Sequence, residues 1–140
     1  MKRILRIVCL IMAVICMGVT VNAEESSQKA SNYFAAYRAY CTATSPAVVT
    51  VSFHVVAVGE MDEVGASEIV IQKSSNGTDW SPAYTFTKEG TSGMIATDTG
   101  SYASTISVAR STGYYYRAHV TFYAKNSSGV GYRHYYTERV

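Results

Sequence analysis

The sequence has few cysteines, and two of the three lie close to its N-terminus. Cys9 and Cys16 fall in an apolar N-terminal stretch, which leaves Cys41 alone in the rest of the chain. A lone cysteine cannot form an internal disulfide, so the folded part must be held together by burial of apolar side chains. No base is placed beside Cys41 in the sequence, which favours a buried, inert thiol over a nucleophile.

Motifs of catalysis and of metal binding are also missing. The sequence contains no HExxH or HxH pattern and no Gly-x-Ser-x-Gly elbow. The three histidines all fall in predicted strands: His54, His119 and His134. We interpret them as surface residues of the sheet and not as metal ligands. His119 and His134 become cross-strand neighbours if the last two strands pair, which supplies two metal ligands at most. The sequence therefore predicts no catalytic residues, no metal site and no cofactor.

Positive charge is in excess only because of the N-terminus. The chain of 140 residues has 12 basic and 10 acidic side chains, and removal of Lys2, Arg3 and Arg6 leaves nine basic residues against ten acidic ones. A net charge near zero removes the main support for a nucleic-acid partner, because such binding depends on an excess of basic side chains.

The first 23 residues follow the pattern of a signal peptide. Basic residues precede an apolar run from Ile7 to Val19, and small residues at Val21 and Ala23 form a cleavage site. An uncleaved anchor is the alternative, since the run approaches the length of a short membrane span. The polar residues directly after Ala23 favour cleavage, and bulky Ile15 before Cys16 argues against a lipid anchor. We expect a secreted, extracellular protein without a stable membrane anchor.

The remaining 117 residues are enough for one compact core. Residues 24–31 are predicted to be a disordered lead-in, and residues 32–140 a single domain. No long amphipathic helix is evident, and runs of alternating or β-branched residues are separated by turn residues. The predicted strands are Val48–Val56, Ser67–Ser74, Trp80–Phe86, Ser101–Ala109, Tyr116–Lys125 and Tyr132–Thr137. Asn76-Gly77 is a hairpin signal, and Asn126–Gly131 is the last turn.

Residues Asn32–Thr44 carry aromatic side chains at helical spacing. Their aromatic content and the surrounding β pattern nevertheless favour an edge strand over a helix. With this segment included, about seven short strands are expected. The fold class is therefore all-β, an antiparallel β-sandwich.

The stretch "YYYRAHVTFYAKNSSGVG" resembles the F strand, the F–G turn and the start of strand G of a fibronectin type III or immunoglobulin-like domain, with Tyr116 as the corner tyrosine. Together, "GEMDEVGASEIVIQKSSNGTDW" and "YRAHVTFYAKNSSG" are similar to a family of small secreted bacterial proteins of unknown function, over roughly Val48 to Thr137. The resemblance implies an exported, immunoglobulin-like sandwich. It implies no activity.

Three carboxylates, Glu60, Asp62 and Glu63, precede Gly65 in a segment that is predicted to be a loop. Hard cations bind such loops through several oxygen ligands. The spacing lacks the regular ligand pattern of an EF-hand, so an ordinary solvated loop is favoured over a cation site.

Alternation along the longest predicted strand separates a core face from a solvated face. Tyr116, Val120 and Phe122 fall on the core face. The candidate binding residues on the solvated face are Arg117, His119 and Tyr123, with Arg133 and Tyr135 from the closing strand. Tyrosine and arginine are enriched at recognition surfaces. A simpler interpretation, that cross-strand aromatic pairs stabilise the sheet, carries somewhat more weight from sequence alone.

The function expected from these observations is that of a secreted, non-enzymatic binding or adhesion module. Its partner would be a surface glycan or a protein, and its oligomeric state is open. The alternative is a small bacteriocin-like or toxin-like effector, for which small size and export are the arguments. An enzyme ranks third.

We expect the mature protein to begin at Glu24, because Ala23 closes the small-residue cleavage site. N-terminal sequencing of secreted material checks this. A protein that retains Met1 in a membrane fraction would contradict both the export and the charge argument.

Overall fold

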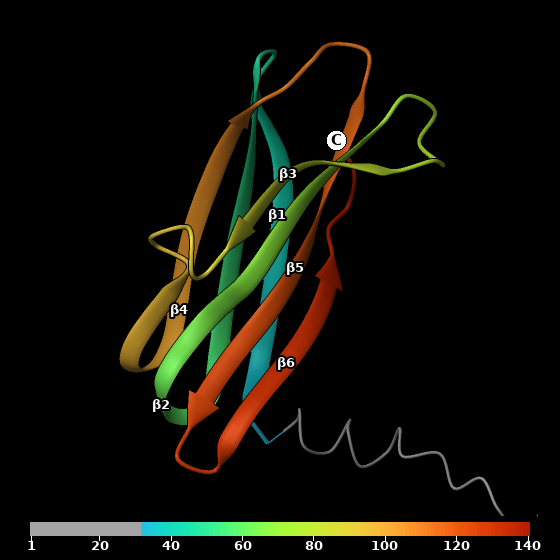
Figure 1. Cartoon of the computed structure of the whole chain (residues 1–140). Helices are drawn as coiled ribbons and strands as arrows, with labels where there is room; N and C mark the ends of the chain where they lie inside the picture. The colour runs from blue at the N-terminus through green and yellow to red at the C-terminus, as the bar shows by residue number, and fades with distance from the viewer. Residues whose placement is uncertain (1–31) are drawn as a thin grey trace, which may run out of the picture.

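The computed structural model describes residues 32–140, so the predicted signal peptide (1–23) and lead-in (24–31) lie outside the described residues. The described part is all-β, with antiparallel pairing throughout and no helix (Figure 1). Its strands are β1 (Phe34–Ser45), β2 (Val48–Ser74), β3 (Ser81–Thr87), β4 (Ile95–Ala109), β5 (Tyr115–Asn126) and β6 (Gly129–Tyr136). Within residues 32–140 no helix is long and apolar enough to cross a membrane.

Strand β2, with 27 residues, organises the sheet. Its first part, Val48–Val56, pairs with β1 on one side and with β4 on the other. Its last part, Glu68–Lys73, lies between β3 and β5, and β6 extends the sheet beyond β5. We call the first group of strands the N-terminal wing and the second the C-terminal wing. Between them the sheet curls into a half-barrel (Figure 1).

The curl begins at Gly59, whose φ is 110°. Glycine adopts a positive φ at little cost in free energy, because it has no Cβ. The pairing of β2 with β4 shifts register there, between Val56 and Met61. Gly65 is the second such position, because an added Cβ there would clash with the carbonyl oxygen of Met94. These glycines therefore let β2 bend without losing its neighbours.

The core lies between the inner faces of the two wings. Phe122 of β5 is fully buried, and its ring centroid lies 6.3 Å from that of Phe53 and 5.4 Å from that of Tyr37. Phe53 and Tyr37 belong to the N-terminal wing, so this one ring joins both wings. The predicted core residues are confirmed as buried: Tyr116, Ala118, Val120, Phe122 and Ala124. Cys41 is also buried, as expected.

The expected count of about seven strands is wrong for the described residues, which form six. Two predicted strands, Val48–Val56 and Ser67–Ser74, are the two ends of β2. The predicted loop at Glu60–Gly65 is part of that strand, because Met61 and Val64 are buried and the segment pairs with β4. The edge strand expected at residues 32–44 is confirmed as β1, which pairs with β2 alone.

The two hairpin turns differ from their predicted forms. The β2–β3 connection spans residues 75–80 rather than two residues, and Asn76 caps it with its side-chain oxygen, which accepts hydrogen bonds from the backbone N–H groups of Thr78 and Asp79. The tight turn joins β5 to β6, where Asn126 pairs with Gly129 and Ser127 and Ser128 form the tip.

We expect Phe122→Ala to lower the free energy of unfolding by about 3–5 kcal/mol, the usual cost of removing a large buried aromatic ring. The control is Lys125→Ala on the same strand, which is exposed and should change stability by less than about 0.5 kcal/mol. Urea unfolding of both variants measures the difference. Small and equal effects would show that Phe122 does not join the wings.

Candidate functional site

The outer face of the C-terminal wing carries a row of aromatic and basic side chains. We call it the outer ladder and define it as Trp80, Arg117, His119, His134 and Tyr136. The strand pairing assembles it, since His119 of β5 lies opposite Tyr136 of β6, and Thr121 lies opposite His134. Cross-strand partners share a face of the sheet, so β6 places its side chains beside those of β5.

Arg117 is held between two aromatic rings. Its guanidinium carbon lies 4.3 Å from the ring centroid of Trp80 and 5.0 Å from that of Tyr136. Its Nε donates a hydrogen bond of 2.8 Å to Oε1 of Gln72 on β2. Cation–π contacts on both sides and one hydrogen bond therefore define the orientation of this side chain.

The histidines continue the ladder. The His119 ring stacks on Tyr136 with a centroid distance of 4.4 Å and an interplanar angle of 13°. Nε2 of His119 lies 3.2 Å from Nδ1 of His134, a hydrogen bond whose direction depends on the tautomers. The hydroxyl of Thr121 lies 3.3 Å from the same Nδ1 atom. The cross-strand histidine pair expected from the sequence is thus present.

The environment of His119 disfavours its charged form. Burial lowers the pKa of its imidazole below the ordinary value of 6.5, and positive charge on His134 and Arg117 lowers it further. Glu68 acts in the opposite direction. The ladder therefore holds His119 neutral near pH 7, with one ring nitrogen as a donor and one as an acceptor.

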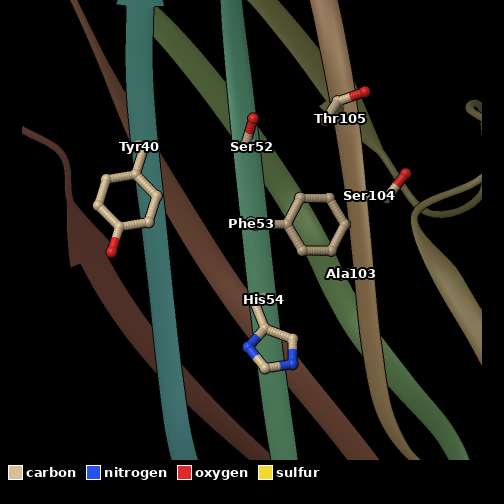
Figure 2. A pocket seen from close by; sticks show the side chains of 7 residues that line it. All are labelled: Tyr40, Ser52, Phe53, His54, Ala103, Ser104 and Thr105. Carbon is tan, nitrogen blue, oxygen red and sulfur yellow. The ribbon is translucent and has the colours of Figure 1, made fainter.

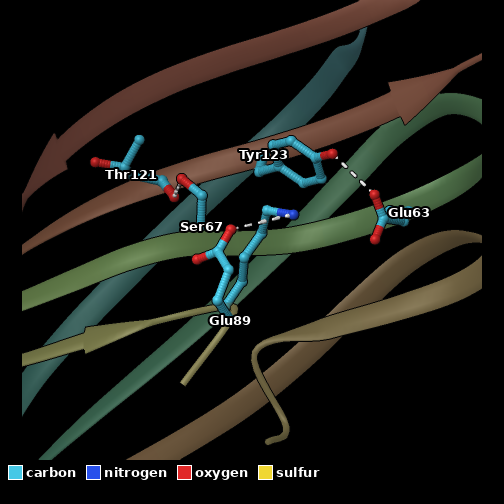
Figure 3. A network of polar contacts seen from close by, with 6 residues as sticks. Glu63, Ser67, Glu89, Thr121 and Tyr123 are labelled. Atoms are coloured by element: carbon cyan, nitrogen blue, oxygen red, sulfur yellow. Dashed lines mark hydrogen bonds and ion pairs between the residues drawn. The ribbon is translucent and has the colours of Figure 1, made fainter. Parts of the chain in front are cut away.

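Tyr123 lies beside the ladder but is buried, with 4% of its surface exposed. Its hydroxyl donates a hydrogen bond of 2.8 Å to Oε2 of Glu63 (Figure 3). The Lys88 ammonium lies 4.7 Å from the ring centroid and 3.5 Å from the Glu89 carboxylate. Gly65 is the β2 partner of Tyr123 and has no side chain, so the ring has room to lie against the sheet. Burial and the Glu63 hydrogen bond both raise the pKa of Tyr123.

The structure separates the five residues that the sequence places on one solvated face. Arg117 and His119 lie on the outer face, as expected, and both are partly buried. The expectation that Tyr123 is exposed is wrong. Arg133 and Tyr135 lie on the inner face, because they pair with the core residues Phe122 and Val120. Tyr135 packs edge to face against Tyr37, with centroids 6.3 Å apart.

Sequence reasoning missed Trp80, chose Tyr135 and not Tyr136 among the tyrosines of the closing strand, and did not assign His134 to the binding face. For Tyr136 and His134, the signal that would have found them is the two-residue turn at Ser127-Ser128. That turn pairs Asn126 with Gly129 and so sets which residues of β6 share the outer face. Tyr132, which is 50% exposed, lies on the outer face by the same register, opposite Tyr123.

A second surface feature is a hollow of about 450 Å³ on the N-terminal wing. Figure 2 shows the side chains that line it, from three adjacent strands: Tyr40, Ser52, Phe53, His54, Ala103, Ser104 and Thr105. Tyr40 and His54 are exposed there, and Arg38 donates a hydrogen bond of 3.3 Å to the Tyr40 hydroxyl. The lining residues offer no carboxylate and no ladder of stacked rings.

The chemistry of the other candidates follows from their placement. In the described part of the chain no three His, Cys, Asp or Glu side chains converge as metal ligands. The carboxylates of Glu60, Asp62 and Glu63 stand along β2 and not on a flexible loop. Burial raises the pKa of the Cys41 thiol to about 11, so it is protonated and a weak nucleophile near pH 7.

Comparisons with known proteins identify no family. No family model matches the chain, and no curated protein matches it. One similar solved structure is described as "X-ray structure of Northeast Structural Genomics Consortium target SoR45". It is 10% identical, the match covers 75% of this chain and 81% of that chain, and the TM-score is 0.44. No family or activity is inferred from it.

We expect His119 to titrate below pH 6.5 in the folded protein, as measured by NMR of its imidazole signals. His134→Gln should raise this pKa, because it removes a positive neighbour. Because the pKa of His119 is lower in the folded state than in the unfolded state, folding disfavours its protonation. Its contribution to stability is therefore full above pH 6.5 and is lost as the pH falls towards the folded-state pKa. A pKa at or above 6.5, unchanged in His134→Gln, would contradict this description of the pair.

Proposed function

We propose that the protein is a secreted, non-enzymatic binding or adhesion module that recognises a surface glycan or a surface protein through the outer ladder. The observation that carries the proposal is the sandwich of Arg117 between Trp80 and Tyr136, continued by His119 and His134. Export is supported by the N-terminal residue pattern alone.

The exposed part of the ladder suits a flat partner. Tyr136 is 54% exposed and Tyr132 is 50% exposed, and exposed His134 lies between them along β6. Such rings offer apolar faces for packing and hydroxyl groups at their edges for hydrogen bonds. Arginine and tyrosine are the residue types that most often dominate binding energies at interfaces. A sugar ring or an extended peptide lying along β6 would contact both the apolar ring faces and the hydroxyl groups.

We further propose kinship with the fibronectin type III and immunoglobulin-like sandwiches and with the secreted bacterial family that the sequence resembles. One contact supports the first part: the Tyr116 hydroxyl accepts a hydrogen bond of 2.8 Å from the backbone N–H of Ser111, five residues upstream. A tyrosine hydroxyl bonded to backbone a few residues upstream is the defining contact of the tyrosine corner. Kinship of this kind would imply a scaffold and no specific ligand.

The test is a screen of the secreted protein against a glycan array and against purified surface proteins, repeated with Tyr136→Ala and Trp80→Ala. Each variant should weaken binding by at least about 1 kcal/mol, roughly fivefold, because each removes one ring of the ladder. Tyr40→Ala is the matched control, since Tyr40 is 53% exposed and lies on the other wing.

Two results would count against the proposal. Equal binding by the parent and by both ladder variants would exclude the ladder as the binding surface. A loss confined to Tyr40→Ala would place the binding site in the hollow of the N-terminal wing instead. Circular dichroism of each variant separates loss of binding from loss of fold.

A further inference from the structure

The sheet leaves several strand edges without a neighbour. Within residues 32–140, β1, β3 and β4 each pair with β2 alone, and β6 pairs with β5 alone. An open edge presents unpaired N–H and C=O groups, and these bind any further strand that reaches them. Folded proteins block such edges with charged residues, with proline, with short strands or with a covering segment. The four edges differ in how well they are blocked.

Three of these edges carry a protective feature. Strand β3 is short and contains Pro82, which has no N–H to donate. Strand β6 has the charged residue Arg133 among its inward-facing side chains. Strand β1 carries Arg38, and its inward-facing residues Ala39 and Cys41 are already covered, with 2% and 5% of their surfaces exposed. Each of these edges therefore resists the addition of a further strand.

The edge of β4 is unprotected. From Ser101 to Ala109 the sequence contains no charged residue, no proline and no glycine. The inward-facing side chains of Tyr102, Ile106 and Val108 pack against the core but stay partly exposed, unlike their counterparts on β1. Strand β4 lies at the margin of the sheet (Figure 1). The core is thus incompletely covered along this edge.

The hydrogen bonds at the end of β4 show which backbone groups face away from β2. The N–H of Arg110 donates a hydrogen bond of 2.9 Å to the carbonyl of Ala47, next to β2. Backbone groups alternate in direction along a strand, so the even-numbered residues of this part of β4 face β2 and the odd-numbered ones face outward. The hydroxyl of Tyr84 confirms this alternation, because it donates a hydrogen bond of 2.9 Å to the carbonyl of Ala109 from the outward side.

The outward groups in the middle of this edge have no partner. The backbone N–H and C=O groups of Ala103, Thr105 and Ser107 form no hydrogen bond within residues 32–140, and all three residues are exposed. The two ends are occupied, since Tyr84 bonds the carbonyl of Ala109 and the N–H of Ser101 lies 3.5 Å from the Thr99 hydroxyl. The open stretch of the edge is therefore 103–107.

We propose that this edge pairs with β4 of a second copy of the chain, antiparallel, about a two-fold axis at Thr105. Thr105 then faces Thr105 of the second copy, and Ala103 faces Ser107. These positions form three facing pairs, and each pair exchanges two backbone hydrogen bonds, which gives about six bonds in all. The N-terminal wings of the two copies join into one continuous sheet.

The composition of the strand is what favours a second copy as the partner. A segment without charged residues meets no like-charge repulsion when it lies beside itself. The same axis places Tyr102 opposite Val108, a pair of an aromatic and a β-branched side chain, which stabilises antiparallel sheets. The added strand also covers the partly exposed side chains of the inner face. Because the axis uses the open stretch of both copies, assembly stops at two chains.

The outer ladder takes no part in this contact, since it belongs to the C-terminal wing. The dimer therefore carries two ladders, one from each copy, and both remain accessible. This inference does not depend on the proposed function, and its failure would leave the ladder unaffected.

The first experiment is sedimentation velocity of the secreted protein over a dilution series. We expect a reversible dimer at high concentration. Thr105→Lys should raise the dissociation constant of the dimer at least about tenfold, because it places two like charges opposite each other at the axis. Thr42→Lys is the matched control, since Thr42 is an exposed threonine on β1, at the far side of the same wing. The control should dimerise as the parent does.

A charge-swap experiment tests the axis itself and separates loss of pairing from loss of fold. Thr105→Lys and Thr105→Glu should each be monomeric alone. An equimolar mixture of the two should form a heterodimer, because opposite charges then face each other across the axis. A variant that had failed to fold could not be rescued in this way.

Four results would overturn the proposal. The first is a parent protein that stays monomeric at every concentration, and the second is assembly that continues beyond two chains. The third is a Thr105→Lys variant that dimerises as strongly as the parent. The fourth is a mixture of the Lys and Glu variants that stays monomeric.

Discussion

The architecture depends on the continuity of β2 through its bend. This strand pairs with β1, β3, β4 and β5, so each of the two wings contains one end of it. The bend requires a residue that tolerates positive φ at Gly59 and one without a side chain at Gly65, where the backbone of Met94 approaches closely. Once β2 is bent, its apolar alternation points inward on both wings. A single core then forms between them, with Phe122 at the junction.

Much of the fold could be predicted from the sequence, because alternation along a strand is a local property. The burial of Tyr116, Val120 and Phe122 follows from their spacing of two residues and needs no knowledge of the neighbouring strands. Edge strand β1 was predictable for a related reason, since its aromatic residues fit a β pattern. The prediction of a loop at residues 60–65 was wrong. The carboxylates and the glycine suggested a turn, whereas Met61 and Val64 are buried and continue the strand.

The site was harder to predict, because it depends on register between strands. The sequence pattern marked Asn126–Gly131 as a turn and left its length open, and a shift of one residue moves every β6 side chain to the other face. The tight turn at Ser127-Ser128 puts Arg133 and Tyr135 inside and His134 and Tyr136 outside. The burial of Tyr123 was not predictable at all. It depends on Gly65, fifty-eight positions earlier in the chain, and on Lys88 from beyond β3.

Preorganisation is the physical difference between the outer ladder and an ordinary polar sheet surface. Immobilising a long side chain on binding costs about 0.5–1.5 kcal/mol, and a free arginine is among the most flexible residues. Arg117 already has a fixed position, because Gln72 orients its Nε and two rings enclose its guanidinium. The Tyr136 ring is restrained in turn by stacking on His119. A partner that binds this surface therefore contacts side chains that have already lost their conformational entropy during folding. For this reason the ladder is a better candidate than Tyr40, which is equally exposed but stacks on no other ring.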